Sequence, residues 1–220
     1  DIDASRLTLE LLETQEFEAD SQEGAIEALS RLGVKLAIDD LGSGYNSLKR
    51  LAELPFDTIK VDQSLTLNLR RSPMLSFSLV STLLKLGRDL GRQVIIEGAQ
   101  DTDTVQAVFA LGATLAQGFA LARPMPAAQF QAWCAARRDV ADACGVSGPL
   151  GALALHWALA HGGAAHVGVA QDGPVARWLR DCGATAEVLG WHEQLHLDPA
   201  SWSHDQPFVA WLLRELRARP

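Results

Sequence analysis

Apolar and polar positions in the first 130 residues follow two periods in turn. Short, nearly continuous apolar runs predict five β-strands, at Leu7–Leu12, Val34–Ile38, Thr58–Val61, Gln93–Ile96 and Thr114–Leu121. Apolar residues three and four apart predict helices at Gln22–Leu32, Met74–Leu90 and Asp103–Leu111, each followed by a glycine. Ser21 and Thr102 are the predicted N-caps of two of these helices. Strands that are apolar on both faces and alternate with helices indicate a parallel sheet, either open or closed into a barrel.

Beyond residue 147 the pattern is helical throughout. The predicted helices are Leu150–Ala160, Val175–Cys182, a stretch around Glu187–Leu197, and Phe208–Arg219. The preceding segment VSGPLG, residues 146–151, contains two glycines and a proline, as is typical of a boundary. The composition changes as well, because every lysine precedes residue 86 and all 6 histidines follow residue 155. We therefore predict a barrel segment at 1–130, a connecting helix or linker at 131–147, and a small helical bundle at 148–220 with a sensory or docking role.

Charge and cysteine content narrow the class of protein. The net charge of -8 argues against broad contact with nucleic acid or with an anionic membrane surface. No apolar run is long enough to span a bilayer, and the 3 cysteines contain no Cys-x-x-Cys pair. We expect a cytoplasmic region of α/β class without a disulfide framework.

Polar side chains stand at the end of each predicted strand. In an α/β barrel the carboxyl ends of the strands form the active-site mouth, so these side chains are expected to meet there. In chain order they are Glu10, Asp39 with Asp40, Lys60 with Asp62, Glu97, and Gln117.

Adjacent carboxylates such as Asp39 and Asp40 stay ionised in a poorly solvated site when a cation compensates them. Oxygen ligands select hard divalent ions, so the pair indicates Mg²⁺ or Mn²⁺. Structural roles remain open for each residue taken alone. Asp39 could cap the next turn, Lys60 could pair with Asp62 or Asp40, and Glu97 could cap a loop.

The segments ELLE, AIDDLGSGYNSL, IKVD, VIIEGAQD and LAQGFALARPMP resemble, in order and spacing, the signature segments of the bacterial EAL domain. The resemblance covers about residues 1–130. It implies a partial TIM-like (β/α) barrel, with about five of the eight βα units, followed by the small all-α module. It also implies a cyclic-di-GMP phosphodiesterase that forms linear pGpG with two Mg²⁺ or Mn²⁺ ions.

The resemblance also implies roles for individual residues. Glu10 resembles a metal ligand at a strand end, and Asp39 and Asp40 resemble the pair shared between two metals. Glu97 and Gln117 are similar to the groups that hold the second metal and its water. Lys60 is similar to the lysine that orients the attacking water or stabilises the phosphoryl charge.

Further residues resemble the family's supporting groups. Glu13 is similar to the glutamate that anchors the loop after the aspartate pair, a loop that governs the second metal and dimer contacts in the family. Arg123 and Pro124 stand where the family contacts guanine. The remaining supporting residues are Gly42, Ser43 and Gly44 of that loop, and Asp62.

The resemblance begins partway through the family pattern. We predict that the N-terminal part of the domain is missing, including the Glu-Ala-Leu motif of its first strands, and that the chain is a fragment with little turnover by itself. Gln100 stands where the family usually has a second glutamate. Expected partners are cyclic-di-GMP, a second copy of the barrel, and an upstream sensory or GGDEF-type domain. Two other functions remain open: a non-catalytic cyclic-di-GMP receptor, and an unrelated metal-dependent barrel enzyme.

The helical module contains a second candidate metal site. His192 and His196 are four residues apart, so on a helix they share a face and could bind one ion together with His156 or Cys182. The module faintly resembles the chemoreceptor zinc-binding helical bundle, which implies zinc. The cysteine of that family falls at Gly173 here, and the histidines could instead be ordinary surface or core-edge groups.

Overall fold

The computed structural model describes residues 2–12, 19–41, 51, 54–136, 145–162, 172–198 and 201–218. In chain order the elements up to residue 136 are η1 (Ala4–Arg6), β1 (Thr8–Leu12), α1 (Ala19–Arg31), β2 (Lys35–Leu41), β3 (Thr58–Val61), α3 (Gln63–Leu67), α4 (Pro73–Asp89), β4 (Gln93–Ile96), α5 (Thr102–Ala110), β5 (Leu115–Ala116) and α6 (Ala127–Ala136). The helices α7 (Pro149–Ala160), α8 (Pro174–Asp181), α9 (Ala186–Leu197) and α10 (Pro207–Ala218) follow.

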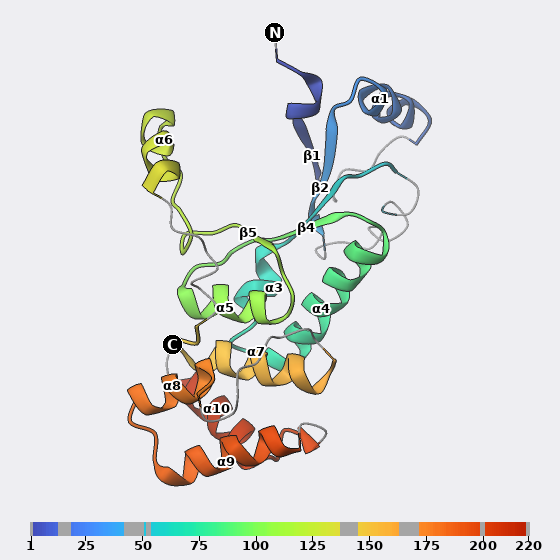
Figure 1. Ribbon diagram of the computed structural model, residues 1–220. Helices are drawn as coiled ribbons and strands as arrows, with labels where there is room; N and C mark the ends of the chain where they lie inside the picture. Colours follow the sequence, from blue (N-terminus) through green and yellow to red (C-terminus); the bar gives the residue numbers. More distant parts are fainter. Residues whose placement is uncertain are drawn as a thin grey trace.

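The five strands form one parallel sheet in chain order, β1-β2-β3-β4-β5 (Figure 1). Parallel strands paired in sequence with helical crossovers are the arrangement of a (β/α) barrel, so the predicted partial barrel is confirmed. All of β3 is buried, whereas β1 at one edge of the sheet is mostly exposed. The sheet therefore has its apolar centre at β2–β4 and open edges at β1 and β5.

The end of β2 departs from regular strand geometry at the aspartate pair. Its pairing with β3 shifts register between Ile38 and Leu41, and Asp40 has a φ of 59° in the left-handed region. Aspartate tolerates this conformation better than bulkier residues do. A bulge of this kind re-aims side chains, so Asp39 and Asp40 need not alternate between the two faces of the sheet.

Three predictions about local structure are wrong. The fifth strand stops at Ala116 instead of continuing to Leu121, because Gly118 turns against the backbone of Ala99 too closely for a side chain. Helix α5 is capped by Asp101, whose side chain accepts from the Thr104 amide, so Thr102 is its first helical residue. Ser21 lies inside α1 rather than before it.

The chain does contain a Glu-Ala-Leu tripeptide, at residues 27–29. It lies within α1, where Glu27 forms an exposed ion pair with Arg31, and not at a strand end. It is therefore an ordinary helical segment and not the strand-end motif that the resemblance would require.

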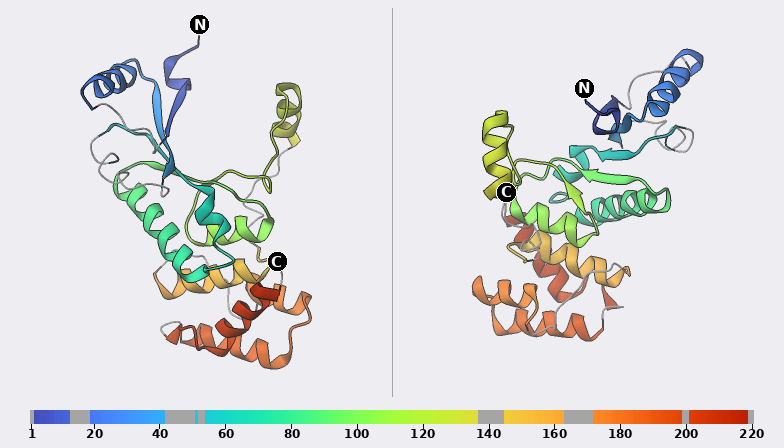
Figure 2. Two further views of the ribbon diagram at one scale, coloured as in Figure 1. Left: turned by 180° about the vertical axis from the view of Figure 1, so that it is seen from behind. Right: turned by 45° about the horizontal axis from the view of Figure 1, so that its top comes forward.

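Helix α7 joins the barrel segment to the helices that follow it. It packs against α5 and α4 on one side and against α10 on the other, and Figure 2 shows this layering from two further directions. Apolar side chains from both regions, among them Phe77 of α4 and Trp157 of α7, belong to one core. The division at residues 130 and 147 stays a prediction. Within the described residues, no helix has the length and apolar character needed to cross a bilayer.

Candidate active site

The ammonium group of Lys60 lies at the centre of the strand-end residues. Its Nζ atom is 2.9 Å from Glu10 Oε2, 3.0 Å from Asp39 Oδ1 and 2.8 Å from Glu97 Oε1. These carboxylates come from β1, from β2 and from the residue after β4, while Lys60 is on β3. The Lys60 side chain is only 7% exposed, whereas Glu10 is half exposed. Burial acts to lower the pKa of Lys60, but its bonds to Glu97, Glu10 and Asp39 outweigh this and raise the pKa.

Asp40 and Asp62 form a second acidic pair beside this cluster. Burial raises the pKa of Asp40, and the negative charges of Asp39 and Asp62 raise it further. Burial also acts to raise the pKa of Asp62, but hydrogen bonds from Ser64 and from the Gln63 amide lower it overall. The hydrogen bond between the two carboxyl groups therefore raises the pKa of Asp40 and lowers that of Asp62.

The strand ends therefore hold more negative charge than their lysine neutralises. Oxygen atoms of Asp39, Asp40 and Glu97 all lie within 4.8 Å of one another. Oxygens that share one Mg²⁺ or Mn²⁺ ion, with bonds of about 2.0–2.2 Å, are spaced no farther apart than this. The donor set and its surplus charge fit a hard divalent cation.

The other predicted site residues fall in three places. Gln117 follows β5. Its main-chain N–H donates to the Ile96 carbonyl, which places the residue beside the end of β4. Arg123 and Pro124 are exposed beyond it, with the Arg123 guanidinium 4.6 Å above the Phe119 ring. Glu13, Gly42, Ser43 and Gly44 lie outside the described residues.

Thr66 is a contact that the sequence did not predict. Its buried hydroxyl donates a 2.6 Å hydrogen bond to the main-chain carbonyl of Glu97. Thr66 is on α3, a five-residue helix too short to show a helical period in the sequence. No motif marks it, because the interaction links a side chain to a backbone atom 31 residues away.

A second cluster of metal-binding groups lies in the helical module. His156 of α7 faces His192 and His196 of α9, with ring centroids 5.2 Å and 5.0 Å from the His156 ring. One ligand atom from each of the three lies within 4.8 Å of the others, and the Nε2 atoms of His192 and His196 are 3.1 Å apart. His156 and His192 are almost fully buried.

The imidazoles of this cluster are held in the neutral form. His156 donates its Nδ1 proton to the Ala152 carbonyl at 2.9 Å, so its Nε2 atom presents a lone pair. That Nε2 is buried without a hydrogen-bond partner among the described residues. Burial, together with smaller contributions from the neighbouring imidazoles, lowers the pKa of His156 to about 4 and that of His192 to about 3.

Comparison with known proteins assigns the first part of the chain. The family described as EAL domain matches residues 1–124. Over 133 residues the chain is 35% identical to the cyclic di-GMP phosphodiesterase RocR of Pseudomonas aeruginosa, a match that covers 59% of this chain and 33% of RocR. The chain thus spans a third of the length of that relative.

Solved structures agree with the family match. The PaMucR phosphodiesterase in complex with c-di-GMP superimposes with a TM-score of 0.54 at 36% identity, over 59% of this chain and 52% of that one. A manganese and c-di-GMP complex of BlrP1 from Klebsiella pneumoniae gives a TM-score of 0.51 at 31% identity, over 56% of this chain and 31% of that one. With the family match covering more than half of the 220 residues, the chain belongs to the EAL domain family.

Proposed function

We propose that this chain carries the catalytic strand ends of a metal-dependent phosphodiesterase that hydrolyses cyclic-di-GMP to linear pGpG. The observation that carries the proposal is the convergence of Glu10, Asp39 and Glu97 on the buried Lys60. Carboxylates from β1, from β2 and from the residue after β4 face one ammonium of a parallel sheet, and barrel enzymes place their chemistry at the carboxyl ends of such strands.

Asp39, Asp40 and Glu97 are the residues that would hold divalent cations, with Glu10 and Gln117 at the flanks. Two Mg²⁺ or Mn²⁺ ions bound there would polarise the phosphodiester and acidify a water molecule. The fit rests on the surplus negative charge and on the spacing of the three carboxylates.

The protein's own groups would prepare this site in two ways. Lys60 Nζ, held by Glu10, Asp39 and Glu97, keeps a fixed positive charge beside the place where phosphate oxygens would bind. A cation bound by Asp40 would offset the neighbouring negative charges that raise the pKa of this carboxyl group. Lys60 would then orient the water that attacks the phosphorus atom.

Exposed residues beyond β5 are proposed to contact the nucleotide. The Arg123 guanidinium lies over Phe119, which leaves a flat cationic surface of the kind that stacks on a guanine base, and Pro124 follows it. Pairing of two copies through the barrel, an upstream sensory or GGDEF-type domain and a cytoplasmic site of action stay predictions.

The test compares turnover with binding in the full-length protein that contains this chain. Glu97→Gln removes a ligand charge while keeping the size of the side chain, and Glu187→Gln in the helical module is the matched control. We expect Glu97→Gln to lower the hydrolysis rate at least about 100-fold and to change cyclic-di-GMP affinity far less. Hydrolysis that Glu97→Gln leaves unchanged would refute the proposal, and tight binding without hydrolysis in the parent would identify a receptor instead.

The imidazole cluster supports a second function, in the helical module. We propose that His156, His192 and His196 bind a transition-metal ion of the Zn²⁺ class through neutral nitrogens. The observation that favours this is the buried, unpartnered Nε2 of His156, which lies against two further imidazoles. Three imidazoles suit Zn²⁺ or Co²⁺ and leave one position of a tetrahedral ion for another ligand.

Cobalt provides the test of this second site. Co²⁺ added to the apo-protein should give the visible absorption of a tetrahedral ion, and His156→Gln should abolish it. His204→Gln, which changes an exposed histidine of the same module, should leave the spectrum intact. A spectrum that persists in His156→Gln would show that the ion binds elsewhere.

A further inference from the structure

The end of β4 is held against helix α3 by two contacts. The Thr66 hydroxyl donates to the Glu97 carbonyl at 2.6 Å, and Thr66 is 3% exposed. The next residue, Gly98, has a φ of 74° and lies so close to Gln63 that a Cβ at this position would come within 2.6 Å of the Gln63 Cβ. These contacts with α3 therefore fix the backbone of Glu97 and Gly98, and with it the position of the Glu97 side chain.

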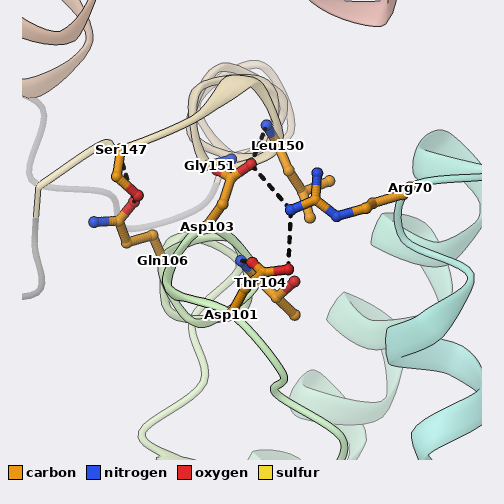
Figure 3. A network of polar contacts seen from close by, with 8 residues as sticks. All are labelled: Arg70, Asp101, Asp103, Thr104, Gln106, Ser147, Leu150 and Gly151. Atoms are coloured by element: carbon orange, nitrogen blue, oxygen red, sulfur yellow. Dashed lines mark hydrogen bonds and ion pairs between the residues drawn. The ribbon is translucent and has the colours of Figure 1, made fainter. Parts of the chain in front are cut away.

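The segment that follows the carboxyl end of α3 contributes to an ion-pair network. Arg70, three residues after α3, donates to Asp101 at 3.0 Å and lies 3.5 Å from Asp103 (Figure 3). Asp101 caps α5, and Asp103 is in the first turn of the same helix. The segment that fixes Glu97 is thus joined to the start of α5 by a guanidinium bound to two carboxylates.

Asp103 also caps α7, the first helix of the module. Its carboxylate accepts from the amides of Leu150 and Gly151, at 3.2 Å and 2.7 Å, and supplies the cap that Gly148 cannot. A Cβ on Gly148 would lie 2.4 Å from the Asp103 carboxylate, so a larger residue here would displace that carboxylate from the amides it binds. Figure 3 shows Asp103 between the Arg70 side chain and the amino end of α7, with Gln106 bonded to Ser147 beside it.

We propose that this network links the helical module to the metal-binding strand ends. The hydrogen bonds between Asp103 and α7 would then control the position of the Glu97 carboxylate, and so its affinity for a metal ion. Thr66 and Arg70 are positioning residues in this proposal. It rests on the proposed function of the strand ends and names the regulation of that site. Because α7 carries His156, an ion bound in the imidazole cluster would act on the same helix that Asp103 caps.

Two substitutions test the two ends of the link in the full chain. Thr66→Val keeps the shape of the side chain and removes the hydroxyl, and Thr66→Ser retains it. Arg70→Gln removes the guanidinium, and Arg71→Gln changes the exposed neighbouring arginine as the matched control. Mn²⁺ affinity, measured from the paramagnetic resonance signal of the free ion, should fall about fivefold in Thr66→Val and in Arg70→Gln, the size of effect expected from one lost hydrogen bond. Thr66→Ser and Arg71→Gln should bind as the parent does.

The double variant shows whether the two residues act by one route. If Arg70 works through Thr66, Arg70→Gln should have no further effect on Mn²⁺ affinity in the Thr66→Val background. Hydrogen exchange without metal gives an independent reading, and Arg70→Gln should speed exchange at residues 97–99 as well as at the first turn of α7. Effects that add in full, or exchange at 97–99 that stays at the parent rate, would overturn the link. A parent chain that binds no Mn²⁺ would refute the proposed function itself, and with it this regulation, whatever the exchange data show.

Discussion

The strand ends and the imidazole cluster gather metal-binding groups by opposite means. At the strand ends, charged oxygens surround a charged lysine and Glu10 remains half open to solvent. In the helical module, three imidazoles face one another and two of them are almost fully buried. The first site is stable because charges are paired, and the second because its groups are uncharged.

Without a bound metal, the two sites have different electrostatic requirements. The strand ends need a cation at all times, and the Lys60 ammonium supplies one. The imidazole cluster needs its members to stay unprotonated, since a proton on one ring would be a buried charge facing two further rings. The two sites should therefore respond differently to loss of charge, to acid and to the type of metal.

Removing the lysine should have the largest effect. Lys60→Met leaves Glu10, Asp39 and Glu97 facing one another without their ammonium, and we expect a loss of about 3–5 kcal/mol in the free energy of unfolding at pH 7. Urea denaturation followed by circular dichroism measures it, and Mn²⁺ should restore part of the loss. Lys85→Met, which removes an exposed helical pair with Asp89, should cost less than about 0.5 kcal/mol. Equal losses in the two variants would show that the strand-end charges are not balanced by Lys60.

The second-largest effect should be the loss of stability of the helical module in acid. The pKa of His156 in the folded protein is about 4, below its unfolded value of 6.5, so the unfolded chain takes up a proton first as the pH falls. The stability contributed by the neutral ring is complete above pH 6.5 and is lost towards pH 4, by about 3 kcal/mol for this residue. Unfolding of the metal-free protein between pH 7 and pH 4.5 measures this. His156→Gln should reduce the dependence by this share, because His192 also contributes to it, and His204→Gln should leave it unchanged. The same slope in both variants would contradict a buried neutral His156.

Metal preference should separate the two sites. Mn²⁺ should bind the carboxylates and Co²⁺ the imidazoles, because oxygen and nitrogen ligands differ in softness. Glu97→Gln should weaken Mn²⁺ binding about 10–100-fold and leave Co²⁺ binding unchanged, while His196→Gln should do the reverse. Isothermal titration with each ion checks both halves. Loss of both ions in either variant would show that the two ions do not bind through separate sets of ligands.

The cap of α5 should give the smallest effect. Asp101→Ala removes the acceptor for the Thr104 amide and one partner of Arg70, and we expect a loss of about 1 kcal/mol. Asp3→Ala, which removes a cap on the short exposed helix η1, is the control and should change stability by less. Thermal unfolding with Asp101→Ala as stable as Asp3→Ala would mean that α5 needs no side-chain cap.

Local patterns predicted the long elements and missed the short ones. The strands at Thr58–Val61 and Gln93–Ile96 and all four helices of the module lie within about two residues of their predicted positions. Helix α7 is almost continuously apolar and buried, and α8 and α10 are amphipathic, so both patterns are clear in the sequence. Helix α3 was missed because five residues show no period, and β5 was predicted too long because apolar residues continue past Gly118.

The composition of the strand-end site was predictable, whereas its contacts were not. A parallel sheet brings successive strand ends together, so Asp39, Lys60 and Glu97 could be placed at one edge from the sequence. That Lys60 contacts three carboxylates at once depends on side-chain lengths and on the bulge at Asp40, neither of which has a sequence signal. The Thr66 bond to a main-chain carbonyl depends on tertiary structure alone.

Diffraction from a crystal of the parent protein soaked in Mn²⁺ would show whether the strand ends bind a divalent cation. The anomalous signal of manganese locates the ion without reference to any assumed role for a residue. We predict peaks within bonding distance of the carboxylates of Asp39, Asp40 and Glu97, with Lys60 beside them. Anomalous density absent from these strand ends, with the carboxylates still bound to Lys60 alone, would contradict the account.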